Sequence, residues 1–203
     1  AHLLTAKLNI ASYANPADIA DAIDEAAAML LKELGRNEAI SAVFDFTLAN
    51  IYFQQEKLDV AADAYRAAVA KYPKFRRAWK NLGLIYIRRG EFTEALPALT
   101  RVVELGGGDA ITYGLLGYAY GSVENNLSAE SAYRMAILLD PKTLDWKMGL
   151  ARSFFKQARY AEAEEAHRRA LAIFEQSLGS THPGIATVWL SLSDLMRLTG
   201  RFV

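Results

Sequence analysis

The sequence predicts an all-α protein built from stacked, antiparallel helix pairs. Two observations support this class: small and apolar residues recur with a period of 34, and within each copy the apolar residues follow helical spacing. A fixed period of this size indicates supersecondary units that each need a neighbouring copy to bury their apolar face.

The clearest copy places an aromatic residue, a leucine, a glycine and a tyrosine on one face of its first helix: Trp79, Leu82, Gly83 and Tyr86. A shift of 34 residues aligns them with residues of the same kinds: Tyr113, Leu116, Gly117 and Tyr120. In this register Gly83 faces the small Ala95 of the second helix, so we interpret it as a packing residue. Gly90 follows the first helix and is interpreted as a turn residue with positive φ.

These residues resemble the tetratricopeptide repeat family, in the form W-x-x-L-G-x-x-Y, then G-x-F-x-x-A-x-x-x-L, then a closing proline. The resemblance implies a right-handed α-α superhelix, a solenoid of stacked antiparallel helix pairs. The fourth copy is longer, and its Gly179…His182-Pro183 connection is similar to the repeats of kinesin light chains. We expect N-terminal capping helices, three standard repeats, an extended fourth repeat and the first helix of a truncated fifth: 1–41, 42–75, 76–109, 110–143, 144–185 and 186–203.

Charge and composition exclude little by themselves. The chain has 23 basic and 23 acidic residues and no cysteine, and no apolar run is long enough to span a membrane. We expect a soluble protein, cytoplasmic or periplasmic, with its compartment undecided. The charge is uneven, however, because residues 71–89 hold seven Lys/Arg and no acid, whereas residues 1–70 hold five Lys/Arg and ten Asp/Glu.

No motif for catalysis or metal binding is present. The three histidines are His2, His167 and His182; no two of them have ligand spacing, and His167 occupies a core position of its repeat. Nucleophile elbows, phosphate loops and HExxH motifs are absent. The sequence therefore predicts a protein that is not an enzyme and needs neither cofactor nor metal.

The family resemblance also implies that first helices line a concave groove that takes an extended peptide or a partner helix. The expected groove side chains are those of the first helices that packing does not use: Phe46, Asn50, Phe53, Arg77, Lys80, Leu84, Arg88, Tyr118, Arg152 and Lys156. Cations among aromatic residues favour an acidic or amphipathic segment of another protein. The alternative is that the basic run 71–89 is a solvated face that pairs with the acidic N-terminal segment.

The first helix of the third repeat carries two additional glycines, Gly114 and Gly121. Glycine inside a helix is unfavourable by roughly 1 kcal/mol each relative to alanine. One interpretation is a hollow beside Tyr118 that receives a partner's side chain. The other is that neighbouring aromatic residues such as Phe155 fill the space.

These observations favour a non-catalytic scaffold that binds another protein. A self-associating structural module is the alternative, and nucleic-acid binding through residues 71–89 ranks third; no membrane partner is expected. For self-association we expect a homodimer through the C-terminal edge, because no second helix would cover the apolar side chains there. Its interface is predicted to include Trp189, Leu195 and Leu198.

Overall fold

A computed structural model describes residues 38–178 and 183–200. Within these residues the chain forms nine α-helices and no strand, which confirms the all-α class. The predicted capping helices lie almost wholly before residue 38, and the Gly179…His182 connection occupies 179–182, so both are outside the described residues.

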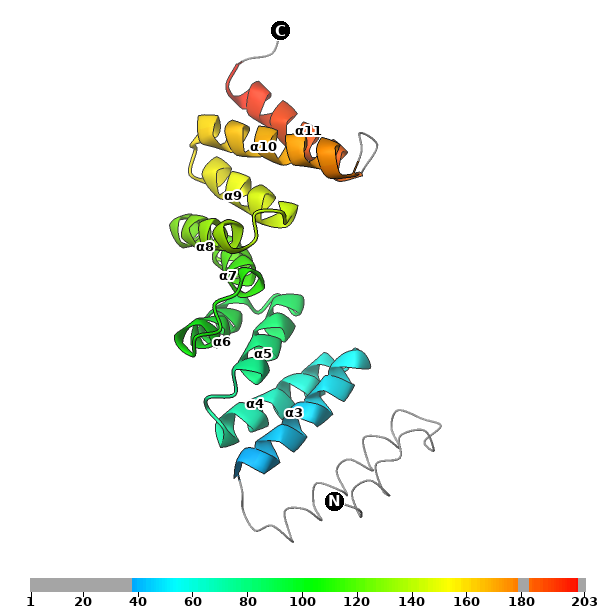
Figure 1. Ribbon diagram of the computed structural model, residues 1–203. Coiled ribbons are helices and arrows are strands. Elements are labelled where there is room, and N and C mark those ends of the chain that lie inside the picture. Colours follow the sequence, from blue (N-terminus) through cyan, green and yellow to red (C-terminus); the bar gives the residue numbers. More distant parts are fainter. Residues whose placement is uncertain (1–37, 179–182, 201–203) are drawn as a thin grey trace. The chain divides into compact units, whose positions relative to one another are not determined.

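The helices belong to two compact units that meet in sequence at Gly90, each described here by itself (Figure 1). The first unit contains α3 (Glu38–Gln54), α4 (Leu58–Lys71) and α5 (Arg76–Arg88). The second contains α6 (Phe92–Glu104), α7 (Ala110–Ser122), α8 (Asn126–Leu139), α9 (Leu144–Lys156), α10 (Tyr160–Leu178) and α11 (Pro183–Leu198). Inside each unit, every helix packs against the next one along the chain.

Four turns between consecutive helices share one backbone conformation. Four residues spaced 34 apart have positive φ, between 58° and 75°: Glu56, Gly90, Glu124 and Ala158. Gly90 fits the sequence prediction, whereas the other three are not glycine. After α3 the Lys57 N–H donates to the Tyr52 carbonyl (3.0 Å) and the Glu56 N–H to the Phe53 carbonyl (3.1 Å). These two bonds form a Schellman motif, which holds a non-glycine residue in the left-handed region.

The core of the first unit combines small residues with one buried tyrosine. Ala49 of α3 and Ala61 of α4 are fully buried in the same cluster, so the two helices approach closely. The buried Tyr65 hydroxyl donates to Asn50 Oδ1 (2.5 Å), and Asn81 Nδ2 donates to the Tyr65 oxygen (2.9 Å). This hydrogen-bond network joins α3, α4 and α5.

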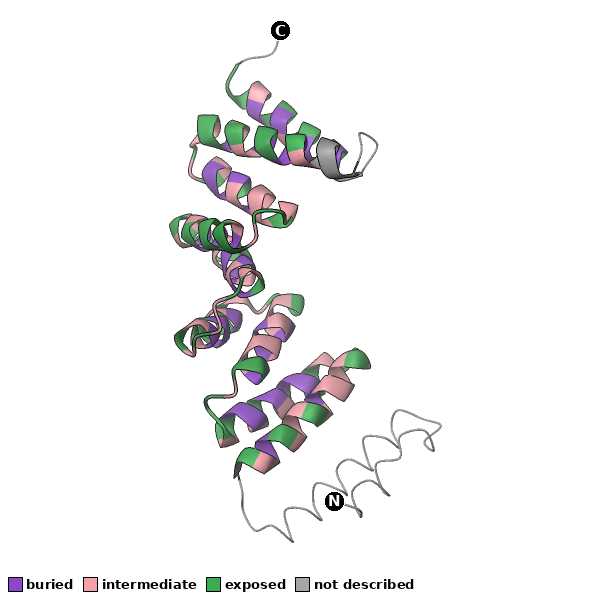
Figure 2. Ribbon diagram, in the orientation of Figure 1, coloured by how far each residue is buried: buried purple, intermediate pink, exposed green. Residues whose placement is uncertain are grey.

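The core of the second unit follows facing sides of consecutive helices, as the buried segments in Figure 2 show. Tyr133 of α8 is nearly buried, and its ring lies against two helical glycines, Gly117 of α7 and Gly149 of α9. At the C-terminal end of this unit, Leu195 of α11 packs with Phe154 and Ala163. Glycine and alanine at these positions admit large side chains from the neighbouring helix.

His167 of α10 occupies the core position that the repeat predicts. Its side chain is only 4% exposed, and its Nδ1 lies 2.8 Å from the Ala163 carbonyl, which can only accept a hydrogen bond, so Nδ1 donates. Burial lowers the pKa of His167 below its ordinary value of 6.5, and the nearby Arg152 acts in the same direction. The folded protein therefore holds this imidazole in its neutral form.

This burial makes the stability depend on pH. Because the folded pKa is depressed, the stabilising contribution is complete above the unfolded value of 6.5 and is lost as the pH falls through the folded pKa. Urea unfolding followed by circular dichroism should show a lower free energy of unfolding at about pH 5 than at about pH 7.5. A His167→Phe variant should show a smaller loss over this interval, and an equal loss would contradict the assignment.

Candidate functional site

Three predicted groove residues of the first unit serve its packing. Phe46 lies 4.7 Å from the Phe75 ring and 5.7 Å from the Tyr65 ring, measured between centroids. Phe53 also packs against this core, and Asn50 belongs to the Tyr65 network. These three side chains contribute to the interior of the first unit.

Several cations of the basic run 71–89 are paired within the first unit. Arg88 contacts Glu56 (3.3 Å) and its guanidinium lies 4.7 Å from the centre of the Phe53 ring. Lys71 pairs with Asp45 (2.6 Å) and Arg89 with Asp59 (2.9 Å). For these three cations the structure favours the alternative of pairing with acidic residues of the preceding segment. The other predicted residues lie on α5, where Arg77 is exposed and Lys80 and Leu84 are half-buried.

In the second unit, three predicted residues meet between α7 and α9. Tyr118, Arg152 and Lys156 line one hollow of about 80 Å³. A second hollow, of about 270 Å³, shares four lining residues with it: Tyr118, Tyr133, Gly149 and Arg152. We call this joint surface the α7–α9 groove; its further lining residues include Gly114, Gly121, Asp145 and Trp146.

The two additional glycines of α7 differ in what surrounds them. A Cβ atom at Gly114 would lie 2.1 Å from Trp146 Cζ3. The absence of a side chain at Gly114 therefore makes room for the Trp146 ring against α7. A Cβ atom at Gly121 would meet only the Ala129 Cβ, at 3.8 Å, and Gly121 lines the smaller hollow. An aromatic residue therefore fills the space at Gly114, although it is Trp146 and not Phe155, while the hollow beside Tyr118 persists at Gly121.

The electrostatics of the α7–α9 groove differ from those of the first unit. Arg152 and Lys156 are exposed one turn apart on α9, and neither has an ion-pair partner within residues 38–178 and 183–200. Burial is the main cause that raises the pKa of Tyr133 to about 12, so its hydroxyl stays protonated at neutral pH. Asp145 lies seven residues before Arg152 on α9, about 10 Å along the helix axis. The arrangement can accept a carboxylate group next to Arg152 and Lys156.

Sequence reasoning missed Trp146, Tyr133 and Gly149 as residues of this site. Tyr133 lies 34 residues after the buried Leu99, and its ring is likewise in the core, but it also lines the groove. Trp146 has a buried indole N–H without a hydrogen-bond acceptor in the described part of the chain. A tryptophan 32 residues after a helical glycine, close to the repeat period, was a signal that could have paired it with Gly114.

The predicted self-association residues fall on two sides of α11. Trp189 is 52% exposed and Leu198 is 54% exposed. Leu195 is only 2% exposed, because its side chain faces Phe154 of α9 and Ala163 of α10. The expectation that Leu195 belongs to an interface is therefore wrong.

Within the described ranges, no three His, Asp or Glu side chains gather as metal ligands do. Over the same residues, none of the helices combines the length and the apolar character needed to cross a bilayer.

Sequence comparisons match one family over most of the chain. Three models of the tetratricopeptide repeat match residues 46–110, 110–143 and 143–203. A curated protein of Arabidopsis thaliana, "Protein KINESIN LIGHT CHAIN-RELATED 2", is 37% identical over 62 residues. That match covers 30% of this chain and 9% of the Arabidopsis protein, so the chain spans only a small part of this relative.

Structure comparisons find the same fold at low identity. A crystal structure of MamA is 21% identical with a TM-score of 0.71 and covers 78% of this chain and 82% of MamA. YrrB, described as a TPR protein with an unusual peptide-binding site, is 17% identical with a TM-score of 0.70 (86% and 84% covered). A tetratricopeptide repeat protein from Parabacteroides merdae is 16% identical with a TM-score of 0.74 (98% and 73% covered).

Proposed function

Because the chain belongs to the tetratricopeptide repeat family, we propose that it is a non-catalytic scaffold that binds an acidic segment of another protein along the α7–α9 groove. The observation that carries this proposal is the pair Arg152 and Lys156, two exposed cations without ion-pair partners in the described residues, beside the hollow at Gly121. A protein with one such pair attracts a carboxylate and holds it by charge-assisted hydrogen bonds.

The first unit supports this placement by contrast. Arg88 was an equally good candidate by sequence, but Glu56 and the Phe53 ring already occupy its guanidinium. An incoming carboxylate would have to compete with Glu56 there, whereas it meets no such competitor at Arg152. The ion pairs of Lys71, Arg88 and Arg89 also reduce the positive charge available to nucleic acid, which weighs against that third candidate.

The aromatic lining adds an apolar component to the expected ligand. Tyr118 is exposed at the groove and stacks edge-on against Phe92, 5.6 Å away between ring centroids. Exposed aromatic rings held by a neighbour bury large area at little entropic cost when a partner binds. YrrB shares the fold and is described as having a peptide-binding site, which is consistent with a peptide ligand for this chain.

A pair of designed peptides tests the proposal. One is a fluorescein-labelled decapeptide with glutamate at alternate positions and apolar residues between them, and its match has glutamine in place of glutamate. In anisotropy titrations, Arg152→Glu/Lys156→Glu should weaken binding of the glutamate peptide by about tenfold or more, because two attractive charges become repulsive. The glutamine peptide should bind wild type and variant with similar, weaker affinity.

The matched control is Lys142→Glu/Arg168→Glu. It produces the same change in net charge with two exposed cations of the second unit that do not line the α7–α9 groove. It should bind the glutamate peptide as wild type does. Equal weakening by both double variants would mean that net charge alone governs binding, and unchanged binding by the Arg152→Glu/Lys156→Glu variant would place the ligand elsewhere.

Self-association is a second candidate function, and one observation favours it. Trp189, Leu190 and Leu198 of α11 are all more than half exposed. Soluble monomers rarely leave several large apolar side chains uncovered together. At about 3.6 residues per turn Trp189 and Leu198 lie on opposite sides of α11, with Leu190 between them, so a second copy that covers α11 in a two-fold dimer would be centred on Leu190.

A further inference from the structure

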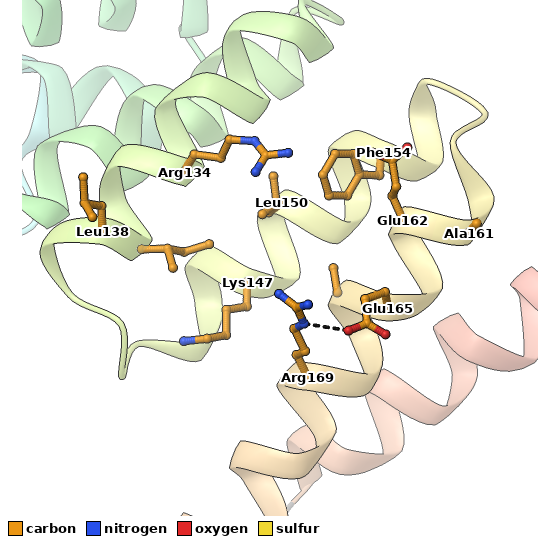
Figure 3. A pocket seen from close by; sticks show the side chains of 11 residues that line it. Arg134, Leu138, Lys147, Leu150, Phe154, Ala161, Glu162, Glu165 and Arg169 are labelled. Atoms are coloured by element: carbon orange, nitrogen blue, oxygen red, sulfur yellow. Dashed lines mark hydrogen bonds and ion pairs between the residues drawn. The ribbon is translucent and has the colours of Figure 1, made fainter.

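A second hollow surface lies on the other side of the second unit's helix pairs. It measures about 570 Å³ and is lined by residues of α8, α9 and α10 (Figure 3). Its apolar lining residues are Ile137, Leu138, Leu150, Phe154, Ala161 and Ala166. We call it the α8–α10 pocket. It shares no lining residue with the α7–α9 groove, and its volume lies in the range of binding sites.

The apolar surface continues out of the α8–α10 pocket onto α8. Leu138 lines the pocket and is nevertheless 73% exposed, and its neighbour Leu139 is about half exposed. Leu127 and Met135 are also exposed on α8 and line a further hollow of about 440 Å³ toward α7. A small molecule inside the α8–α10 pocket would leave these side chains in water, whereas a segment of another protein lying along α8 would cover them.

The charges around the α8–α10 pocket leave hydrogen-bond donors available. Both lining carboxylates are already in ion pairs: Glu165 with Arg169 (2.7 Å) and Glu162 with Arg159. Arg169 uses only its Nε for that pair, so its terminal N–H groups remain for a ligand. Lys147 donates to the Pro141 carbonyl and has no ion-pair partner within the described ranges. Figure 3 shows Lys147 and Arg169 at the same end of the pocket.

We propose that the α8–α10 pocket docks a short amphipathic helix of a partner protein, with its apolar side chains in the pocket and a carboxylate facing Lys147 and Arg169. A helix is the occupant because α8 and α10 form two walls and α9 the floor, as in other helix-in-groove interfaces. The carboxylate follows from charge complementarity: Lys147 has no ion-pair partner in the described residues, and Arg169 binds Glu165 through Nε alone, although the third lining cation, Arg134, is paired with Glu130. This docking site is independent of the proposed function.

The test uses two helical peptides of the length of α8, 14 residues. Both carry leucines along one helix face; beside that face one has two glutamates and the other two lysines. In anisotropy titrations wild type should bind the glutamate peptide more tightly than the lysine peptide. Leu138→Asp should weaken binding of the glutamate peptide by about tenfold or more, and Lys147→Glu should reverse the preference between the peptides.

Ile111→Asp is the matched control, because Ile111 is 54% exposed on α7 and lines neither the α8–α10 pocket nor the α7–α9 groove. This control should bind the glutamate peptide as wild type does. Circular dichroism melts establish that all three variants fold. Equal affinity of wild type for the two peptides, equal effects of Leu138→Asp and Ile111→Asp, or no binding to wild type at about 1 mM peptide would each overturn the proposal.

Discussion

Replacing Gly149 by alanine is expected to destabilise the protein by about 1–3 kcal/mol, although the same change inside a helix is usually favourable. The new Cβ atom would lie 2.2 Å from Tyr133 Cζ and 2.4 Å from Cε1. The ring cannot move away freely, because α7 is equally close: a Cβ built on Gly117 would lie only 2.8 Å from Tyr133 Cδ1 and Cε1. Tyr133 is thus held between two helices at positions where neither can carry a side chain.

Gly121→Ala is the matched control for this prediction. Gly121 is also helical, but a Cβ atom there meets nothing closer than 3.8 Å. This variant should be stabilised by roughly 0.5–1 kcal/mol through reduced backbone entropy of the unfolded chain. Urea unfolding followed by circular dichroism measures both changes. If Gly149→Ala and Gly121→Ala shifted the midpoint in the same direction, the close packing of Tyr133 would be disproved.

The second large effect is expected for Leu195→Ala, which should lower the free energy of unfolding by about 2–5 kcal/mol. Leu195 is buried against Phe154 and Ala163, so the shorter side chain leaves a cavity between α11 and its neighbours. Leu198→Ala removes the same atoms three residues later from an exposed site and should cost no more than about 0.5 kcal/mol. Similar losses in the free energy of unfolding for Leu195→Ala and Leu198→Ala would contradict the burial of Leu195 and the exposure of Leu198.

Trp189→Glu separates the stability of α11 from its proposed role in self-association. Because Trp189 is exposed, this variant should unfold near the wild-type midpoint. If α11 forms a two-fold interface, sedimentation velocity should show a dimer for wild type and a monomer for the variant. A wild type that stays monomeric at high concentration would remove self-association from the candidates.

The helices and turns were readily predicted because each repeat has the same apolar spacing and the same turn position. Apolar spacing set the helix faces, and the turn residue came every 34 positions, at Glu56, Gly90, Glu124 and Ala158. The three that are not glycine show that the position in the repeat matters more than the residue type. Helix contacts on both sides of the turn, together with Schellman hydrogen bonds, hold the left-handed conformation without glycine.

The candidate site was predicted less well, because charges acquire their partners only in three dimensions. Sequence reasoning treated Arg88 and Arg152 as equivalent groove cations. In the structure Arg88 reaches back to Glu56, 32 residues earlier, whereas no carboxylate occupies the corresponding place near Arg152. The repeat equivalent of Arg88 is Lys156, and Glu124 stands where Glu56 does, yet Lys156 and Glu124 form no ion pair in the described residues. The same two residue types are therefore paired in one repeat and unpaired in another, which the sequence alone does not reveal.

Leu195 illustrates the same limit for apolar residues. Helical spacing placed Val188, Leu192 and Leu195 on one stripe, and all three are buried. The prediction for Leu195 was wrong because it assumed that a helix with no following helix packed on it exposes all of its apolar side chains. An amphipathic helix on a single neighbour buries only the stripe that faces it, and Trp189 and Leu198 lie off that stripe.

The freedom of Arg152 and Lys156 from core contacts has a consequence for how such a protein diverges. A substitution at either position changes the charge of the α7–α9 groove without removing a buried atom or breaking an ion pair of the described residues. Natural substitutions at these two positions can therefore change whether acidic, neutral or basic ligands bind, while the free energy of unfolding stays nearly constant. A change at Arg88 instead leaves Glu56 and Phe53 without their contact, so new specificities are expected to arise first on α9.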